Sequence, residues 1–174
     1  MKLSLAAFCC ILASCAVAQA ADIPFTLDNN GITEWFLSSG TVGPTGSGNP
    51  NPTITLDIDS RYAVTVAQWP AHVFELIAKG PTDAQDALLI SGDDNAATFN
   101  GDGGVNLTGF NTSLLTFTLT PALAAAMSSA TQIPGYRCGV HPDTMRADVL
   151  ITPEPATMSL LALGGLALLR RRRS

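Results

Sequence analysis

The sequence predicts an all-β domain, a β-sandwich of the Greek-key type with one short helix. Glycine and proline number 15 and 11 among the 174 residues, and only 13% of the residues are charged, a composition that favours strands and turns. Apolar and polar residues alternate with period two in several short segments, as they do in strands with one buried face. Loops rich in Gly, Pro, Asn and Ser separate these segments, and about seven short strands fit a sandwich.

The first half of the body contributes four expected strands, over residues 23–27, 35–37, 53–59 and 62–67. Asn30 and Gly31 mark a tight turn between the first two, because Asn-Gly suits the positive φ angles of such turns. Residues 40–52 are rich in Gly, Pro, Ser and Asn and are interpreted as a loop. Only Ser60 and Arg61 separate the third and fourth strands, so we expect those two strands to pair as a hairpin.

The second half contributes four more expected strands, over residues 73–78, 88–90, 113–120 and 147–152. The alternation is clearest in the third of these, where Leu115, Phe117 and Leu119 are expected to point inward. The last strand is expected to close the sheet.

One short helix is expected over residues 121–127, because a Pro in its first turn is followed by Ala and Leu, with Thr120 as the cap. A turn is expected at residues 135–136, before the last strand. Residues 92–104 are polar and rich in Gly, Asp and Asn, and are interpreted as a loop. Its acids lack the spacing of an EF-hand, so we interpret them as solvated rather than calcium-binding.

Residues 1–20 are interpreted as an export signal. Lys2 supplies the positive start, an apolar run follows, and Ala18-Gln19-Ala20 provides a small-x-small site for signal peptidase. An alternative is lipoprotein processing, because residues 12–15 resemble a bacterial lipobox that would place a lipid on Cys15. In either case the body of the protein is the segment 21–152.

Residues 153–174 form a separate module. A Pro-Glu-Pro triplet at 153–155 is followed by a largely apolar run of 14 residues and then by four arginines, Arg170 to Arg173. This order closely resembles the PEP-CTERM sorting signal of proteins exported by Gram-negative bacteria. The resemblance implies cleavage by an exosortase and a final place at the cell surface or in the extracellular matrix. Before cleavage the apolar run would associate transiently with the membrane; a plain tail anchor is the alternative.

The body is acidic. Between Asp22 and Pro153 there are 13 acidic residues and four basic ones, which gives a net charge of −9. A surface of this kind excludes nucleic-acid binding through a basic patch. It is consistent with docking of a basic partner, or with acids that simply keep the protein soluble.

A thiol, an imidazole and a thioether recur at Cys138, His141 and Met145, bounded by Gly, Pro and an Asp-Thr pair. This spacing suits a tight loop closing around one small ion. A thiolate is a strong donor to soft metals, a neutral imidazole suits copper, and a Met sulfur can act as a weak axial ligand. One more imidazole is needed, and His72 is the only other histidine in the chain. Cysteine counting agrees, since the other three cysteines lie in the leader and Cys138 cannot form a disulfide within the body.

The pattern Tyr-x-Cys-x-x-His-Pro-x-x-Met-Arg, with a lone His far upstream before an apolar strand, resembles the cupredoxin family of plastocyanin, amicyanin and azurin. The resemblance implies a cupredoxin-like Greek-key sandwich with one type 1 (blue) copper per chain. It implies His72, Cys138 and His141 as strong ligands and Met145 as the axial one. It also implies that His141 is the electron exit, through an apolar patch. Val73, Phe74, Val140 and Pro142 are expected to keep water off the metal.

The function expected from these features is a secreted blue copper protein that carries single electrons to or from a redox partner protein. The alternatives are copper storage or delivery, or a copper-free structural surface module on the same fold. We do not expect an enzyme, because no histidine remains for a second copper centre. A catalytic zinc would not need Met145. A Cys-His hydrolase would place its nucleophile only three residues from its base, and no orienting Asn or Asp is evident.

Overall fold

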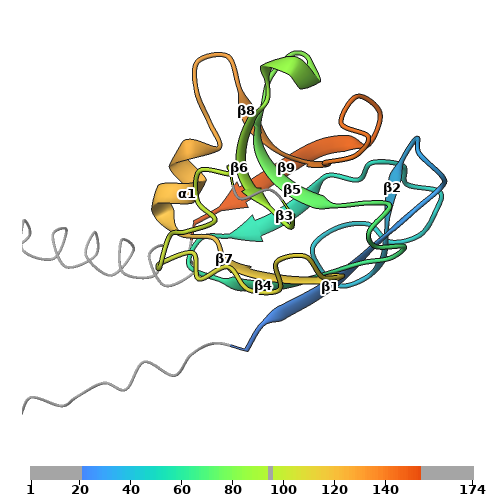
Figure 1. The fold of residues 1–174 in the computed structure, drawn as a ribbon, viewed down its shortest axis with the longest axis horizontal. Coiled ribbons are helices and arrows are strands. Elements are labelled where there is room, and N and C mark those ends of the chain that lie inside the picture. The colour runs from blue at the N-terminus through green and yellow to red at the C-terminus, as the bar shows by residue number, and fades with distance from the viewer. Residues whose placement is uncertain (1–20, 94–95, 154–174) are drawn as a thin grey trace, which may run out of the picture.

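The computed structural model describes residues 21–93 and 96–153, so the leader and nearly all of the sorting tail lie outside it. The described residues form nine strands, one α-helix and one 3₁₀-helix (Figure 1). In chain order these are β1 (Ile23–Asn29), β2 (Trp35–Ser39), β3 (Ile54–Asp57), β4 (Arg61–Val66), β5 (Phe74–Lys79), η1 (Asp83–Gln85), β6 (Ala87–Ser91), β7 (Leu114–Thr118), α1 (Pro121–Ala126), β8 (Ile133–Cys138) and β9 (Arg146–Thr152).

The strands form two sheets that enclose one core (Figure 1). The first sheet has the order β2-β1-β4-β7, and the second has the order β3-β9-β8-β5-β6. Aromatic side chains join the sheets. Phe74 of β5 stacks on Phe117 of β7 with ring centroids 6.3 Å apart, and it meets Phe25 of β1 edge-on at 6.2 Å. The predicted all-β sandwich is therefore confirmed, with both sheets mixed because β1–β4 and β3–β9 pair in parallel.

The expected hairpin between β3 and β4 is wrong, because these strands belong to different sheets. The chain crosses between the sheets at Asp59, whose φ is +63°. The Asp59 N–H donates to Leu119 O, and the Leu119 N–H donates back to Ser60 O, so the corner is held by the segment after β7. Alternation predicts that a strand buries one face, but it does not identify the strand's partner.

The turn expected at residues 135–136 is also wrong, because Gly135 lies inside β8. Gly135 pairs with Ile77 of β5 on one side and with Asp148 of β9 on the other. A Cβ at Gly135 would lie 2.7 Å from Lys79 Cβ and 2.9 Å from Ala147 O. The glycine is therefore needed for close approach of neighbouring strands rather than for a turn. In addition, β9 does not close the sheet, because it lies between β3 and β8.

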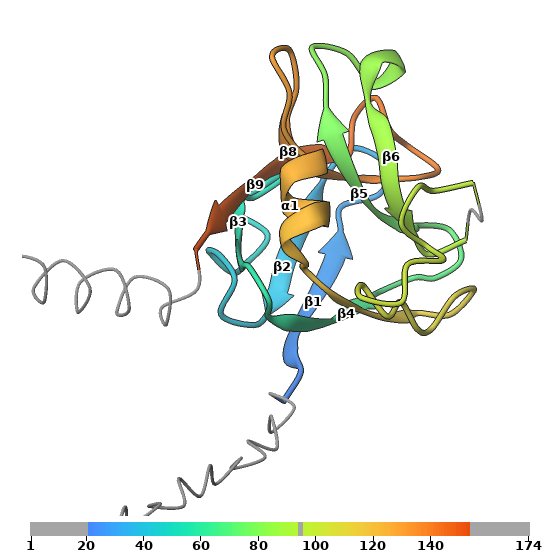
Figure 2. The same ribbon diagram turned by 90° about the vertical axis from the view of Figure 1, so that its left-hand side faces the viewer.

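The short helix is confirmed, one residue shorter than expected. The Thr120 hydroxyl accepts a hydrogen bond from the Leu123 N–H at 3.2 Å, and Pro121 occupies the first turn. These are the signals of a capped helix start. Leu123 is fully buried, so α1 covers part of the core at one end of the sandwich (Figure 2).

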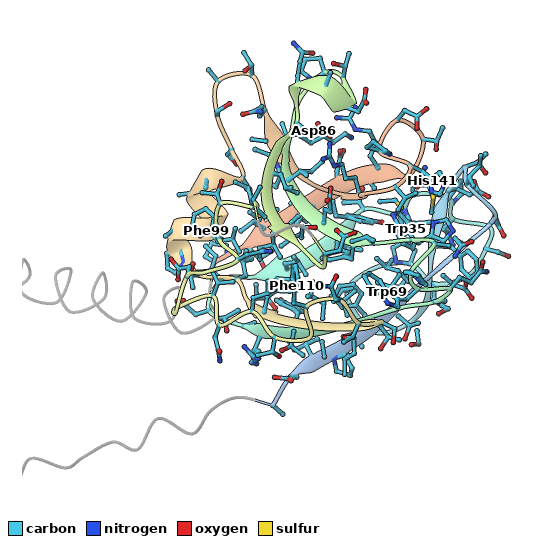
Figure 3. The ribbon with its side chains drawn as sticks, in the orientation of Figure 1. Trp35, Trp69, Asp86, Phe99, Phe110 and His141 are labelled. Atoms are coloured by element: carbon cyan, nitrogen blue, oxygen red, sulfur yellow. The ribbon has the colours of Figure 1, made fainter. Side chains whose placement is uncertain are left out.

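Strand β9 runs from one end of the sandwich to the other. It begins directly after Met145 and ends at Thr152, where the described chain leaves the domain. Trp35 and His141 are labelled at the end of the sandwich opposite that exit (Figure 3). No helix among the described residues has the length and apolar character needed to cross a membrane.

The close approach at Gly135 gives a stability prediction. Gly135→Ala is expected to lower the free energy of unfolding by about 1–3 kcal/mol, because the new methyl group overpacks the space between β5 and β9. Urea unfolding followed by fluorescence measures the change. Gly48→Ala is the matched control, since no atom lies within 4 Å of a Cβ built there. Equal effects of the two substitutions would contradict the packing argument.

Candidate metal centre

Three adjacent strands of the second sheet position the four residues singled out in the sequence. His72 lies two residues before β5, and Phe74 of β5 pairs with Cys138, the last residue of β8. His141 lies in the connection from β8 to β9, and Met145 directly precedes β9. The order β9-β8-β5 therefore brings segments 66 or more residues apart in sequence to one end of the sheet.

Backbone hydrogen bonds fix the connection between β8 and β9. The Cys138 N–H donates to Met145 O at 2.8 Å, and the Met145 N–H donates to His141 O at 3.0 Å. The Gly139 N–H donates to Val73 O at 3.0 Å, which ties the same connection to the segment that carries His72. The relative positions of the four side chains are thus set by main-chain bonds of the sheet and its loop.

The side chains of three of these residues converge. Cys138 Sγ lies 3.6 Å from His72 Nδ1 and 3.7 Å from His141 Nδ1. The three potential ligand atoms all lie within 4.8 Å of one another, and the two imidazole rings have centroids 5.0 Å apart. His72 and Cys138 are buried, whereas His141 is half-buried.

These separations fit a single small ion. Metal–nitrogen bonds are about 2.0 Å and metal–thiolate bonds about 2.3 Å, so two such ligands at tetrahedral to trigonal angles lie about 3.5–3.7 Å apart. The observed Cys138–His72 and Cys138–His141 distances fall in that range. One soft thiolate with two imidazoles is a donor set suited to copper or zinc.

The electrostatics of His72 favour the form that binds metal. Burial lowers the pKa of His72 below its ordinary value, and the nearby His141 lowers it further, while Asp28 acts in the opposite direction. A lowered pKa keeps the imidazole neutral at physiological pH. Neutral imidazole is the ligand form, so protons compete little with a metal at this position.

Met145 lies at the base of the loop, with a fully buried side chain and the two backbone bonds described above. Trp35 of β2 covers the other side of the site. Its ring meets the His72 ring edge-on, with centroids 5.5 Å apart, and is fully buried. The indole N–H of Trp35 has no hydrogen-bond partner among the described residues. Position 35 was expected only to begin a strand, and nothing in the sequence connects it to His72.

The expected apolar surroundings are found in part. Val73 and Phe74 are each 1% exposed and exclude water from the buried side. Val140 is 50% exposed and is therefore not part of the buried wall that Val73 and Phe74 form. It lies at the loop surface, as does Ile32, which is 61% exposed and whose carbonyl accepts a bond from the Thr144 hydroxyl at 2.6 Å. Val140 directly precedes the half-buried His141, so the loop presents an exposed apolar side chain next to that residue in sequence.

Asn51 links the loop to the first sheet, a role that the sequence did not indicate. Its side-chain amide donates to Thr144 O at 3.1 Å, and its Oδ1 accepts from the backbone N–H of Trp35 at 2.9 Å. The residue has a φ of +46°, a conformation that Asn tolerates. Asn51 therefore joins the segment before Met145 to the backbone of Trp35, the residue whose indole covers His72.

Comparison with known proteins identifies the tail. A family model for the PEP-CTERM protein-sorting motif matches residues 152–173. The match begins on the last residue of β9 and otherwise lies almost wholly outside the described residues. No cupredoxin family model matches the body, and no curated protein matches the chain.

Together, the fold and the tail define an exported all-β protein with a candidate metal centre. The predicted sorting signal is confirmed, and it indicates secretion, C-terminal processing by exosortase and a place at the surface or outside a Gram-negative cell.

The Asn51 bridge gives a second prediction. Asn51→Gly keeps the positive φ accessible but removes both side-chain bonds, and is expected to cost about 1–2 kcal/mol of unfolding free energy. Asn49→Gly, which removes one exposed bond to Thr45 O, is the control and is expected to change stability much less. Urea unfolding of both variants checks this, and indistinguishable midpoints would show that the bridge contributes nothing.

Proposed function

We propose that this protein is a secreted type 1 copper protein that carries single electrons at or outside the bacterial envelope. The observation that supports this most is the convergence of one buried thiol and two imidazoles at ligand distances, with Met145 buried at the base of the same loop. His72, Cys138 and His141 would hold the copper, and Met145 would be the weak axial ligand. When bound, the copper would supply a one-electron redox couple.

The surroundings of the ligands suit electron transfer because they resist rearrangement. Main-chain bonds fix Cys138, His141 and Met145 relative to one another, and the second sheet fixes His72 beside them. A site whose ligands move little between oxidation states has a low barrier to exchanging an electron. Buried Val73, Phe74 and Trp35 keep water away from the thiol side.

His141 is the proposed electron exit. It is half-buried, whereas His72 is buried beneath Trp35, so it is the imidazole with access to the surface. Val140, which directly precedes His141, gives the loop an exposed apolar side chain. Exposed apolar patches on soluble proteins commonly mark sites of protein association. A redox partner protein could therefore dock over His141 with a short path to the metal.

The residue inventory argues against a copper enzyme. The chain has two histidines, and the proposed site uses both. A second copper centre that activates oxygen or nitrite would need further histidines. The proposed function is accordingly transfer of electrons rather than conversion of a substrate.

The decisive experiment is an absorption spectrum of the purified protein with Cu(II). An intense blue band from thiolate-to-copper charge transfer is expected, and a mild reductant should bleach it reversibly. Cys138→Ser should abolish the band and weaken copper binding by more than the roughly 10–100-fold typical of changes around a metal site. Copper bound without the blue band would instead favour storage or delivery. No copper binding would favour a structural module.

Met145 provides a separate prediction with a matched control. Met145→Leu should keep the blue band but shift the reduction potential, because only the axial thioether is lost. Met127→Leu makes the same change at another fully buried methionine, which lies in the core beside α1, and should leave the potential unchanged. Voltammetry of the two variants measures the difference. Equal potentials for both variants and the parent protein would remove Met145 from the ligand set.

A further inference from the structure

A buried carboxylate, Asp86, lies between two arginines that flank the proposed ligands. Asp86, labelled in Figure 3, follows η1 and precedes β6. Its side chain is 0% exposed. One carboxylate oxygen accepts from Arg146 Nη2 at 2.6 Å and from the Gly80 N–H at 2.9 Å. The other accepts from Arg137 Nη1 at 3.2 Å. Arg137 directly precedes Cys138, and Arg146 directly follows Met145.

The register of β8 and β9 explains why an anion is needed here. Arg137 pairs directly with Arg146 across the two antiparallel strands. Like charges opposite each other on one face of a sheet repel and destabilise the pairing. Asp86 accepts a charge-assisted bond from each guanidinium, so it converts this repulsion into attraction to a shared anion. Among the described residues, it is the one carboxylate that contacts both arginines.

Further contacts make the cluster rigid. Arg137 Nε donates to Glu75 Oε2 at 2.7 Å, and the Ser91 hydroxyl donates to the other oxygen of Glu75 at 3.1 Å. Arg146 Nη2 also donates to Gly80 O at 2.8 Å. The side chains of Arg137 and Arg146 are only 15% and 14% exposed. Two acids thus balance two arginines on β5, β8, β9 and the segment before β6.

Side-chain alternation relates this cluster to the candidate metal centre. Successive residues of a strand point to opposite faces of the sheet. Cys138 and Met145 are fully buried on the core side, so Arg137 and Arg146 lie on the other face, directly behind them. The Cys138 N–H to Met145 O bond is the next link of the ladder after the Arg137–Arg146 pair. A change in the separation of β8 and β9 at Arg137 and Arg146 would therefore also change the separation of Cys138 and Met145.

We propose that Asp86 is a positioning residue that holds Cys138 and Met145 at a fixed separation by joining Arg137 to Arg146 on the outer face of the sheet. Its effect on a bound metal rests on the proposed function, whereas its effect on the two strands does not. Without the shared carboxylate, β8 and β9 separate at the end that carries the loop. Cys138 then becomes accessible, and the position of Met145 relative to a metal is no longer fixed.

The strand effect is tested on the metal-free protein by the reaction of Cys138 with a disulfide reagent such as dithiobis(nitrobenzoate), in detergent with the tail retained. Mass spectrometry assigns the modified thiol. Asp86→Asn removes the charge with little change of shape, and should accelerate the reaction about tenfold or more, because charged bonds that hold the strands are lost. Asp148→Asn makes the same chemical change on β9, where the one ion pair of the carboxylate among the described residues is with Lys79 at 2.5 Å, and should leave the rate within about twofold.

Global destabilisation is distinguished by the denaturant dependence of the rate. Opening of β8 from β9 alone exposes little surface, so the accelerated reaction should depend only weakly on urea. A dependence as steep as that of complete unfolding would overturn the proposal, as would equal rates for the Asp86→Asn and Asp148→Asn variants. Should Asp86→Asn fail to fold, Asp86→Glu is the replacement test, because it retains the charge on a side chain that is one methylene longer. It should react faster than the parent protein, and a parent-like rate would contradict the proposal.

The metal effect is read from the copper-loaded protein. Asp86→Glu should keep copper bound but move the energy of the thiolate band and the reduction potential, which a role in stability alone would not change. An unchanged band and potential in a folded variant would show that Asp86 does not position the ligands. If the parent protein binds no copper but Asp86→Asn still exposes Cys138, the positioning role stands and the electron-carrier function fails.

Discussion

The candidate centre depends on one constraint, the register of β8 between β5 and β9. That register places Phe74 opposite Cys138 and Arg137 opposite Arg146. From it follow the approach of His72 to the thiol and the short closed loop that ends at Met145. A slip of one residue would turn Cys138 to the outer face and Arg137 into the core, at a large cost for a buried unpaired charge. The same strand register therefore determines both the positions of the candidate ligands and the pairing of the sheet.

The same register explains the buried ions behind the site. Ion pairs out of water are weak sources of stability, because desolvation opposes the attraction, but breaking one partner away is costly. Arg137 and Arg146 find their acids, Glu75 and Asp86, in only one alignment of the strands. The ion pairs therefore act mainly by making other alignments of the strands unfavourable, because a shifted register would leave buried charges unpaired. This argument favours specificity of strand pairing over added stability as the physical reason for ions in this position.

Much of the site could be predicted from the sequence, and the failures have physical causes. Cys138 and His141 are close in sequence, and His72 is the only remaining histidine, so local spacing and counting were sufficient to predict the convergence of these three residues. Eight strands were predictable because alternation reports burial directly, but β8, which contains a Pro and a Gly, was not predicted as a strand. The β3–β4 pairing was not predictable either, because alternation carries no information about partners. Gly135 was misassigned because close packing and tight turns both require glycine. Asp86 and Asn51 act through contacts with residues distant in sequence, and neither has a local pattern.

The direction of β9 separates the centre from the sorting tail. The strand runs from Arg146, next to Met145, to Thr152, where the PEP-CTERM motif begins. Six steps along an extended chain cover about 20 Å, the length of a small sandwich. Retention of the tail in a membrane, or its cleavage by exosortase, therefore acts at the end of the domain far from His141. Because the strand between them is paired on both sides, processing of the tail can proceed without disturbing the loop that carries Cys138, His141 and Met145.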